Sequence, residues 1–215
     1  MGTGKEFDKD YYEGPNAYMN YKYDEHYIQF IDSLMVTFEH INPKLCECCD
    51  QQYFPKSFLD VGCALGYHMK ALKEWHSHRP WNVELTGIDI SEWAVMNADK
   101  SVSDTIGKGN ILQIPYGDNK FDVVMAKDIL EHIPEKDIDR ALYELKRVSK
   151  RWVVISAVIE KVEWDKDETH VTIKPLKWWM DKLKKHGLGY VETRINQVGF
   201  WEPVFVCEII EKEKA

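Results

Sequence analysis

The stretch Phe58-Leu-Asp-Val-Gly-Cys-Ala-Leu-Gly66 is a short apolar run that leads directly into a turn with glycines at positions 62 and 66. This pattern is typical of the first strand and turn of a doubly wound α/β sheet. In such a sheet the ligand lies across the carboxyl ends of the strands, and glycine lets the first turn approach it closely. We therefore expect a ligand site here, against the alternative of an ordinary strand, turn and helix.

The spacing of the glycines argues against a dinucleotide site. A dinucleotide-binding turn has the pattern G-x-G-x-x-G and faces a pyrophosphate, whereas this turn has only Gly62 and Gly66. Asp60 lies just before them and would repel a pyrophosphate, but a carboxylate there suits a ligand with a cationic end. Asp89 follows the next apolar run. It can accept hydrogen bonds from both hydroxyls of a ribose, although a lone acid at a strand end is more often a helix cap.

Short apolar runs alternate with helical patterns along the rest of the chain. The first five expected strands are residues 57–61, 83–90, 105–108, 121–126 and 151–157. The expected helices are residues 25–40, 67–75, 91–98, 136–148 and 175–185. Two last strands, 190–197 and 204–210, are joined by a short turn around Gly199 and must be antiparallel. The order predicts an α/β fold: a mostly parallel seven-stranded sheet with an antiparallel C-terminal hairpin at its edge and helices on both faces.

Four segments in the same order resemble the motifs of class I, or Rossmann-like, S-adenosylmethionine-dependent methyltransferases. Residues 59–66 are similar to the first motif, D/E-x-G-x-G-x-G, with Ala64 in place of the middle glycine. Residues 87–91 are similar to the second motif. Residues 109–111 match the loop that meets the adenine, with Asn110 where the family usually has Asp. Residues 121–133 are similar to the fourth-strand motif that ends in Leu-Glu-His.

The resemblance implies S-adenosylmethionine as the cofactor. It also implies two parts of the chain, an N-terminal helical segment that forms a lid (1–45) and a class I methyltransferase domain (46–215). Lys127 is expected to act mainly through its backbone. The residues expected to bind the cofactor are Asp60, Gly62, Cys63, Ala64, Gly66, Asp89, Ile90, Asn110, Ile111 and Lys127.

A histidine beside several carboxylates is the most unusual feature outside these motifs. His170 follows Asp165, Asp167 and Glu168 in a loop after the fifth expected strand. A neighbouring carboxylate can orient an imidazole and raise its basicity. We interpret His170 as a candidate general base, the alternative being a loop histidine that caps the next helix.

Two segments strengthen this interpretation by resemblance. Residues 167–179 and 17–23 are similar to stretches of bacterial methyltransferases that act on sugars and secondary metabolites. The resemblance implies that Tyr21 reaches the cofactor and that His170 acts as the base. Asp128 is expected near the transferred methyl group, in contact with cofactor or substrate. In the fourth-strand motif the histidine more often holds the turn together than acts as a base. We therefore interpret His132 as a structural residue.

Composition excludes several classes of protein. A formal net charge of −8 does not suit a nucleic-acid-binding surface. No apolar run approaches the roughly 20 residues of a membrane span, and residues 1–10 lack a signal-peptide core. The five cysteines show no disulfide framework and no paired C-x-x-C spacing. We expect a cytoplasmic protein with reduced thiols and, because no set of acids and Asn for Mg²⁺ is recognisable at the strand ends, no metal.

These patterns favour O-methylation of a small molecule, a sugar or natural product, by in-line transfer to a hydroxyl that a histidine deprotonates. One alternative is N-methylation of a small amine or a protein side chain, which the carboxylates at 165–168 would suit. Another is a regulatory partner that binds the cofactor without turnover. The acceptor and the oligomeric state are left open by the sequence.

Overall fold

A computed structural model of the chain describes residues 7–14, 21–41, 54–77, 82–161, 167–191 and 203–210. Its helices are α1 (Lys9–Glu13), α2 (Glu25–Ile41), α3 (Tyr67–Ser77), α4 (Glu92–Met96), α5 (Glu135–Val148) and α6 (Leu176–Lys185), with 3₁₀ turns η1 (Ser103–Thr105) and η2 (Leu130–His132). Its strands are β1 (Ser57–Val61), β2 (Glu84–Asp89), β3 (Ile106–Lys108), β4 (Phe121–Ala126), β5 (Ser149–Ser156), β6 (Leu188–Val191) and β7 (Val204–Ile209).

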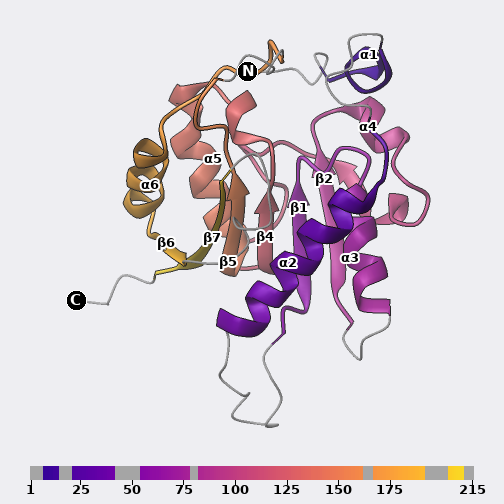
Figure 1. The fold of residues 1–215 in the computed structure, drawn as a ribbon, viewed down its shortest axis with the longest axis horizontal. Coiled ribbons are helices and arrows are strands. Elements are labelled where there is room, and N and C mark those ends of the chain that lie inside the picture. Colours follow the sequence, from indigo (N-terminus) through magenta and orange to yellow (C-terminus); the bar gives the residue numbers. More distant parts are fainter. Residues whose placement is uncertain are drawn as a thin grey trace.

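The seven strands form one sheet in the order β3-β2-β1-β4-β5-β7-β6 (Figure 1). The five strands from β3 to β5 in this order run parallel to one another. β7 is antiparallel to both β5 and β6. The sheet therefore confirms the predicted fold, including the antiparallel edge. The parallel strands have their carboxyl ends at a common edge, where a doubly wound sheet places its ligand.

Helices cover both faces of the sheet because successive strand residues point to opposite sides. On one face Val123 and Met125 of β4 pack with buried residues of α2 and α3. On the other face Val124 and Ala126 pack with buried residues of α5 and α6. Helix α2 crosses the first face diagonally beside α3 (Figure 1). The division of the chain at residue 45 stays a prediction.

The ends of several elements differ from the sequence-based ranges. Ser91 caps α4 as expected, since its hydroxyl accepts a hydrogen bond from the amide of Ala94. The helix is shorter than expected because Asn97 ends it, donating through its backbone to Ala94 and its side chain to Trp93. Strand β6 begins at Leu188, and the rest of the predicted strand 190–197 beyond residue 191 lies outside the described residues, as does the turn around Gly199.

None of the helices in the described ranges is both long and apolar enough to cross a bilayer.

An arginine clamp fixes the loop between β3 and β4 to helix α5. Arg147 donates to both carboxylate oxygens of Glu144, at 2.9 and 2.7 Å, and to the carbonyls of Ile114 and Tyr116. The Glu144 side chain is only 2% exposed and also accepts from the Ile114 amide. Hydrogen bonds from Arg147 hold the pKa of Glu144 below its usual range. Arg147 therefore supplies most of the positive charge that balances the buried Glu144 carboxylate.

We expect Arg147→Leu to lower the free energy of unfolding by about 2–3 kcal/mol, because it leaves a buried carboxylate with only the more exposed Arg140 as a partner. Urea unfolding measures this loss. The control is Lys177→Leu, which removes an exposed ion pair with Asp181 and should change stability by less than about 0.5 kcal/mol. Equal effects of the two substitutions would contradict the clamp.

Candidate active site at the carboxyl ends of the strands

The turn after β1 has three residues in the left-handed region. Gly62, Ala64 and Gly66 have φ of 76°, 47° and 80°. A Cβ on Gly62 would come within 2.1 Å of the Ile129 side chain, so the glycine is needed for close packing as well as for conformation. Ala64 adopts the left-handed conformation in spite of its methyl group, which costs about 1–2 kcal/mol. The alanine therefore preserves the shape of the turn at the expense of strain.

The carboxylate of Asp89 ties this turn to the end of β2. It accepts hydrogen bonds from the amides of Ala64 (2.8 Å) and Ser91 (2.7 Å). Burial raises its pKa, and these backbone donors oppose the rise. Each carboxylate oxygen can accept more than one hydrogen bond. Asp89 can therefore hold the turn and still accept from the hydroxyls of a ligand.

A cavity of about 430 Å³ opens beside the turn. Ten of the predicted site residues line it: Tyr21, Gly62, Cys63, Ala64, Asp89, Ile90, Asn110, Ile111, Lys127 and Asp128. Asp60, Gly66 and His170 are not among the residues that line the cavity. The structure thus brings together residues from five separate segments: the four motifs, as their order predicts, and the segment that contains Tyr21. His170 instead lies behind His132, which does line the cavity.

Asp60 is fully buried just beneath this wall. Its Oδ2 atom has no hydrogen-bond partner among the residues that the structure describes. Burial, followed by the charge of Asp89, raises the pKa of Asp60 to about 8, while the charge of Lys127 lowers it. A buried carboxylate oxygen without a partner is costly. A cationic group in the cavity would relieve that cost.

Lys127 and Asp128, directly after β4, form an ion pair with each other. Asp128 has a φ of 57°, and its Oδ1 and backbone amide both bond to the hydroxyl of Ser156 at the end of β5. The Lys127 ammonium also lies 5.5 Å from the centre of the Phe30 ring. These contacts fix the Asp128 carboxylate at the cavity wall and join three elements: β4, β5 and α2.

Two histidines from distant segments meet next to Asp128. The rings of His132 and His170 pack edge to face, with 4.8 Å between their centres. The hydroxyl of Thr169 lies 2.8 Å from Nδ1 of His132 and also bonds to Asp167. Burial, followed by the charge of His170, lowers the pKa of His132 to about 4. Its imidazole is therefore neutral at pH 7 and held in one orientation.

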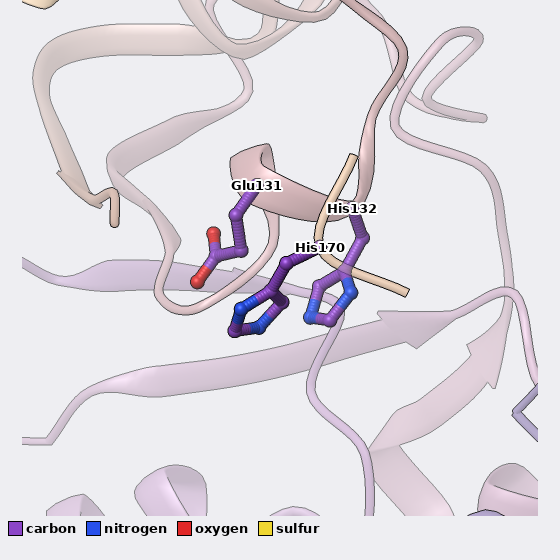
Figure 2. Close-up of side chains that lie close together, drawn as sticks. All are labelled: Glu131, His132 and His170. Atoms are coloured by element: carbon purple, nitrogen blue, oxygen red, sulfur yellow. The ribbon is translucent and has the colours of Figure 1, made fainter. Parts of the chain in front are cut away.

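Glu131 lies against these histidines. Its side chain is buried, and Figure 2 shows its carboxylate directed toward the His170 ring. Burial, followed by the charge of Asp128, raises the pKa of Glu131 to about 8. In the sequence Glu131 is only part of a motif, with no signal of its burial or of its neighbours.

Comparison with known proteins shows which family this chain resembles. The sequence profile of a methyltransferase-domain family matches residues 59–155. Residues 59–155 are therefore similar to a methyltransferase domain, as the four sequence motifs predict.

Two similar proteins illustrate the range of this methyltransferase family. A probable chloroplastic tocopherol O-methyltransferase of Oryza sativa subsp. japonica is 28% identical, over 40% of this chain and 25% of its own length. An ajmaline N-methyltransferase of Rauvolfia serpentina is 27% identical, over 59% of this chain and 43% of its own. The chain spans less than half the length of these curated relatives.

A solved structure extends the likeness of the fold to nearly the whole chain. The magnesium protoporphyrin IX methyltransferase of Synechocystis PCC 6803, with bound S-adenosylmethionine, has a TM-score of 0.65. The match covers 97% of both chains at 14% identity. At this identity the likeness concerns the fold alone.

The cavity beside the residues that match the methyltransferase domain fits S-adenosylmethionine, the cofactor of that family. The cofactor carries a positive charge on its sulfonium and another on its ammonium. The unpartnered Oδ2 of Asp60 and the carboxylates of Asp89 and Asp128 offer negative charge that only Lys127 offsets among the predicted site residues. These three carboxylates therefore suit a cationic ligand better than a pyrophosphate.

Several aromatic and imidazole groups on the cavity wall were not predicted. Helix α1 contributes Tyr11 and Tyr12, and the Tyr12 ring stacks on Trp93 of α4 with 5.2 Å between centres. His68, in the first turn of α3, lies between the rings of Tyr27 and Phe30. The adjacent tyrosines before Gly14 and a histidine two residues after Gly66 were the available signals. The spacing of these residues in the sequence does not distinguish residues of a binding site from residues of the hydrophobic core.

Burial, followed by the charge of Lys127, lowers the pKa of His68 to about 3. This histidine is thus a neutral wall residue at physiological pH.

We expect Ala64→Gly to raise the free energy of unfolding by about 0.5–1 kcal/mol. The strain removed, about 1–2 kcal/mol, exceeds the added freedom of the unfolded chain, about 0.4–1 kcal/mol. Thermal unfolding should show a higher Tm. As a control, Ala71→Gly in helix α3 should lower the stability by about 1 kcal/mol or more. A lower Tm for Ala64→Gly would show that the turn is not strained.

Proposed function

We propose that this methyltransferase transfers a methyl group to a hydroxyl of a small molecule, such as a sugar or natural product. The observation that carries the proposal is the oriented, neutral His132 at the cavity wall with His170 packed behind it. A hydroxyl is a poor nucleophile and needs to lose its proton as it attacks, whereas a neutral amine does not. A histidine pair beside the cavity is consistent with this need.

When bound, S-adenosylmethionine supplies a methyl group already activated by its sulfonium. The chain's own residues then mainly position the reactants and receive the proton. We assign the cofactor to the cavity wall beside the turn, with Asp89 facing its ribose and Asn110 with Ile111 its adenine. Asp60, buried beneath this wall, acts on its cationic end through its charge. Tyr21, Ile90, Cys63 and the Lys127 backbone complete the contacts.

The acceptor hydroxyl is assigned to the region between Asp128 and His132. Asp128, held by Ser156, orients the acceptor or the methyl-bearing end of the cofactor. The proton of the hydroxyl passes to the histidine pair. His170 keeps a role in proton removal, as the sequence suggested, but acts through the pair because His132 is the member on the cavity wall.

An amine acceptor is the second candidate. It is supported by the carboxylates of Asp24, Asp128 and Asp137 on the cavity wall, which would attract a cationic substrate. The relatives named above act on both kinds of atom, since one is an O-methyltransferase and the other an N-methyltransferase.

We expect binding of S-adenosylmethionine to release a proton from Asp60. Its pKa of about 8 in the free protein falls when a cation lies beside it, so affinity should rise with pH up to about 8 and level off above. Calorimetry at pH 7, in buffers that differ in ionisation enthalpy, measures the proton. In Asp60→Asn the release and the pH dependence should both disappear. Unchanged proton release in that variant would remove Asp60 from the cofactor site.

We expect His170→Ala to lower turnover on a hydroxyl acceptor by about 100-fold or more while S-adenosylhomocysteine still binds. Turnover is measured as S-adenosylhomocysteine released with a panel of hydroxyl- and amine-bearing small molecules. The control is His186→Ala, whose imidazole also contacts a carboxylate, Asp139, but does not line the cavity. Full turnover of His170→Ala on a hydroxyl would reject the histidine's role, and full turnover on an amine would favour the second candidate.

A further inference from the structure

Three side chains with metal-binding atoms converge beside the cavity. Glu131, His132 and His170 each offer one such atom, and the three atoms lie within 4.8 Å of one another (Figure 2). Glu131 and His132 belong to η2, and His170 to the loop before α6. The amides of Val171 and Thr172 both donate to the carbonyl of Glu131 at 2.9 Å. These backbone bonds hold the loop against η2, so the convergence does not depend on side chains alone.

The Glu131 carboxylate is the strongest sign that the cluster takes a ligand. The residue is 1% exposed, and its Oε2 has no hydrogen-bond partner within the described part of the chain. Figure 2 shows the carboxylate beside the His170 ring, with the His132 ring on the other side of His170. A buried oxygen in this state costs free energy. A bound cation supplies the missing partner.

The surroundings of the two histidines match those of metal ligands. The Thr169 hydroxyl engages Nδ1 of His132, which leaves Nε2 as the ligand atom of that ring. An oxygen of Asp167 lies 3.8 Å from Nε2 of His170, and Asp167 also bonds to Thr169. A group that hydrogen-bonds the far nitrogen of a histidine ring, as Thr169 does for His132, is typical of metal sites, where it fixes the ring and strengthens it as a ligand. The Asp167 oxygen lies beyond hydrogen-bond distance of the His170 ring nitrogen and contributes a nearby negative charge.

We propose that Glu131, His132 and His170 bind one divalent transition-metal ion of the zinc type. Two imidazoles and one carboxylate suit Zn²⁺, Fe²⁺ or Co²⁺ rather than Mg²⁺, which prefers oxygen ligands. With metal–ligand distances of about 2.1 Å, ligand atoms on one ion lie roughly 3.3–4.2 Å apart. Small side-chain rotations bring the present separations into that range.

The charges around the cluster favour a cation. Asp128 and Asp167 face it from β4 and the loop before α6, and Lys127 opposes them. The alternative is a metal-free cluster in which Glu131 carries a proton. The site also differs from the sequence-based expectation of no metal, because its ligands come from two segments that only the fold brings together.

An ion bound by these side chains would lie next to the cavity, because its ligand His132 lines the wall. It could bind an acceptor oxygen and lower the pKa of its hydroxyl. The histidines would then act as ligands, and the ion would provide the activation assigned above to the histidine pair. This consequence rests on the proposed function, whereas the binding of the ion does not.

The test measures ion binding to the full chain. The parent is a Cys46→Ser/Cys48→Ser/Cys49→Ser variant, so that these thiols do not bind zinc. After treatment with a chelator, Zn²⁺ and Mg²⁺ are titrated by calorimetry, and Co²⁺ is titrated while its visible absorption is recorded. The same titrations are made on Glu131→Gln, His170→Ala, Thr169→Val and the control His186→Ala. S-adenosylhomocysteine binding is measured on every sample to verify the fold.

We expect one Zn²⁺ per chain, a Co²⁺ spectrum of nitrogen and oxygen ligation, and no comparable binding of Mg²⁺. Glu131→Gln and His170→Ala should weaken Zn²⁺ binding by more than about 100-fold, and Thr169→Val by about 10- to 100-fold. His186→Ala should bind like the parent. The proposal is overturned by the absence of stoichiometric Zn²⁺ binding, or by equal binding in Glu131→Gln and the parent. Ion binding without methyl transfer would instead contradict the proposed function and leave the metal site standing.

Discussion

The link between the turn after β1 and the end of β2 is the constraint on which the site depends. The amides of Gly62 and Cys63 both donate to the carbonyl of Ile88, and the Ala64 amide donates to the Asp89 carboxylate. These bonds hold the turn in its left-handed conformation and keep its backbone at the cavity wall. The same carboxylate bonds the amide of Ser91, the residue that caps α4. Turn, strand end and helix start are thus one rigid unit.

Charge is the second organising feature. Asp60, Asp89 and Asp128 lie close enough that each carboxylate affects the ionisation of Asp60, and Lys127 is the cation that opposes them. Asp60 and Asp89 are buried and Asp128 is partly exposed, and placing these carboxylates together is unfavourable in the absence of a positive ligand. A sulfonium and an ammonium match that need, which explains how a family defined by its glycine turn also selects a cationic cofactor.

The third feature is closure of the cavity by segments far apart in the sequence. Tyr11 of α1 donates to Asp167 at 3.1 Å, and Asp167 bonds the hydroxyl of Thr169, which orients His132. Figure 1 shows α1 near α4 at one end of the sheet. Helix α1, which contributes Tyr11 and Tyr12 to the cavity wall, is therefore joined through hydrogen bonds to His132 on the same wall. Segments far apart in the sequence thus share one polar network beside the cavity.

The sequence by itself determined the sheet, its antiparallel edge and the motif residues that line the cavity, because strand alternation and the glycine turn are local properties of the chain. It could not reveal that His132 faces the cavity with His170 behind it, since residues in two separate loops carry no signal of their distance. The unpartnered oxygens of Asp60 and Glu131 were equally hidden, because burial and the loss of partners arise only when several elements pack together. Local patterns predicted which residues of the four motifs line the cavity. Packing decided which polar groups from other segments meet beside it.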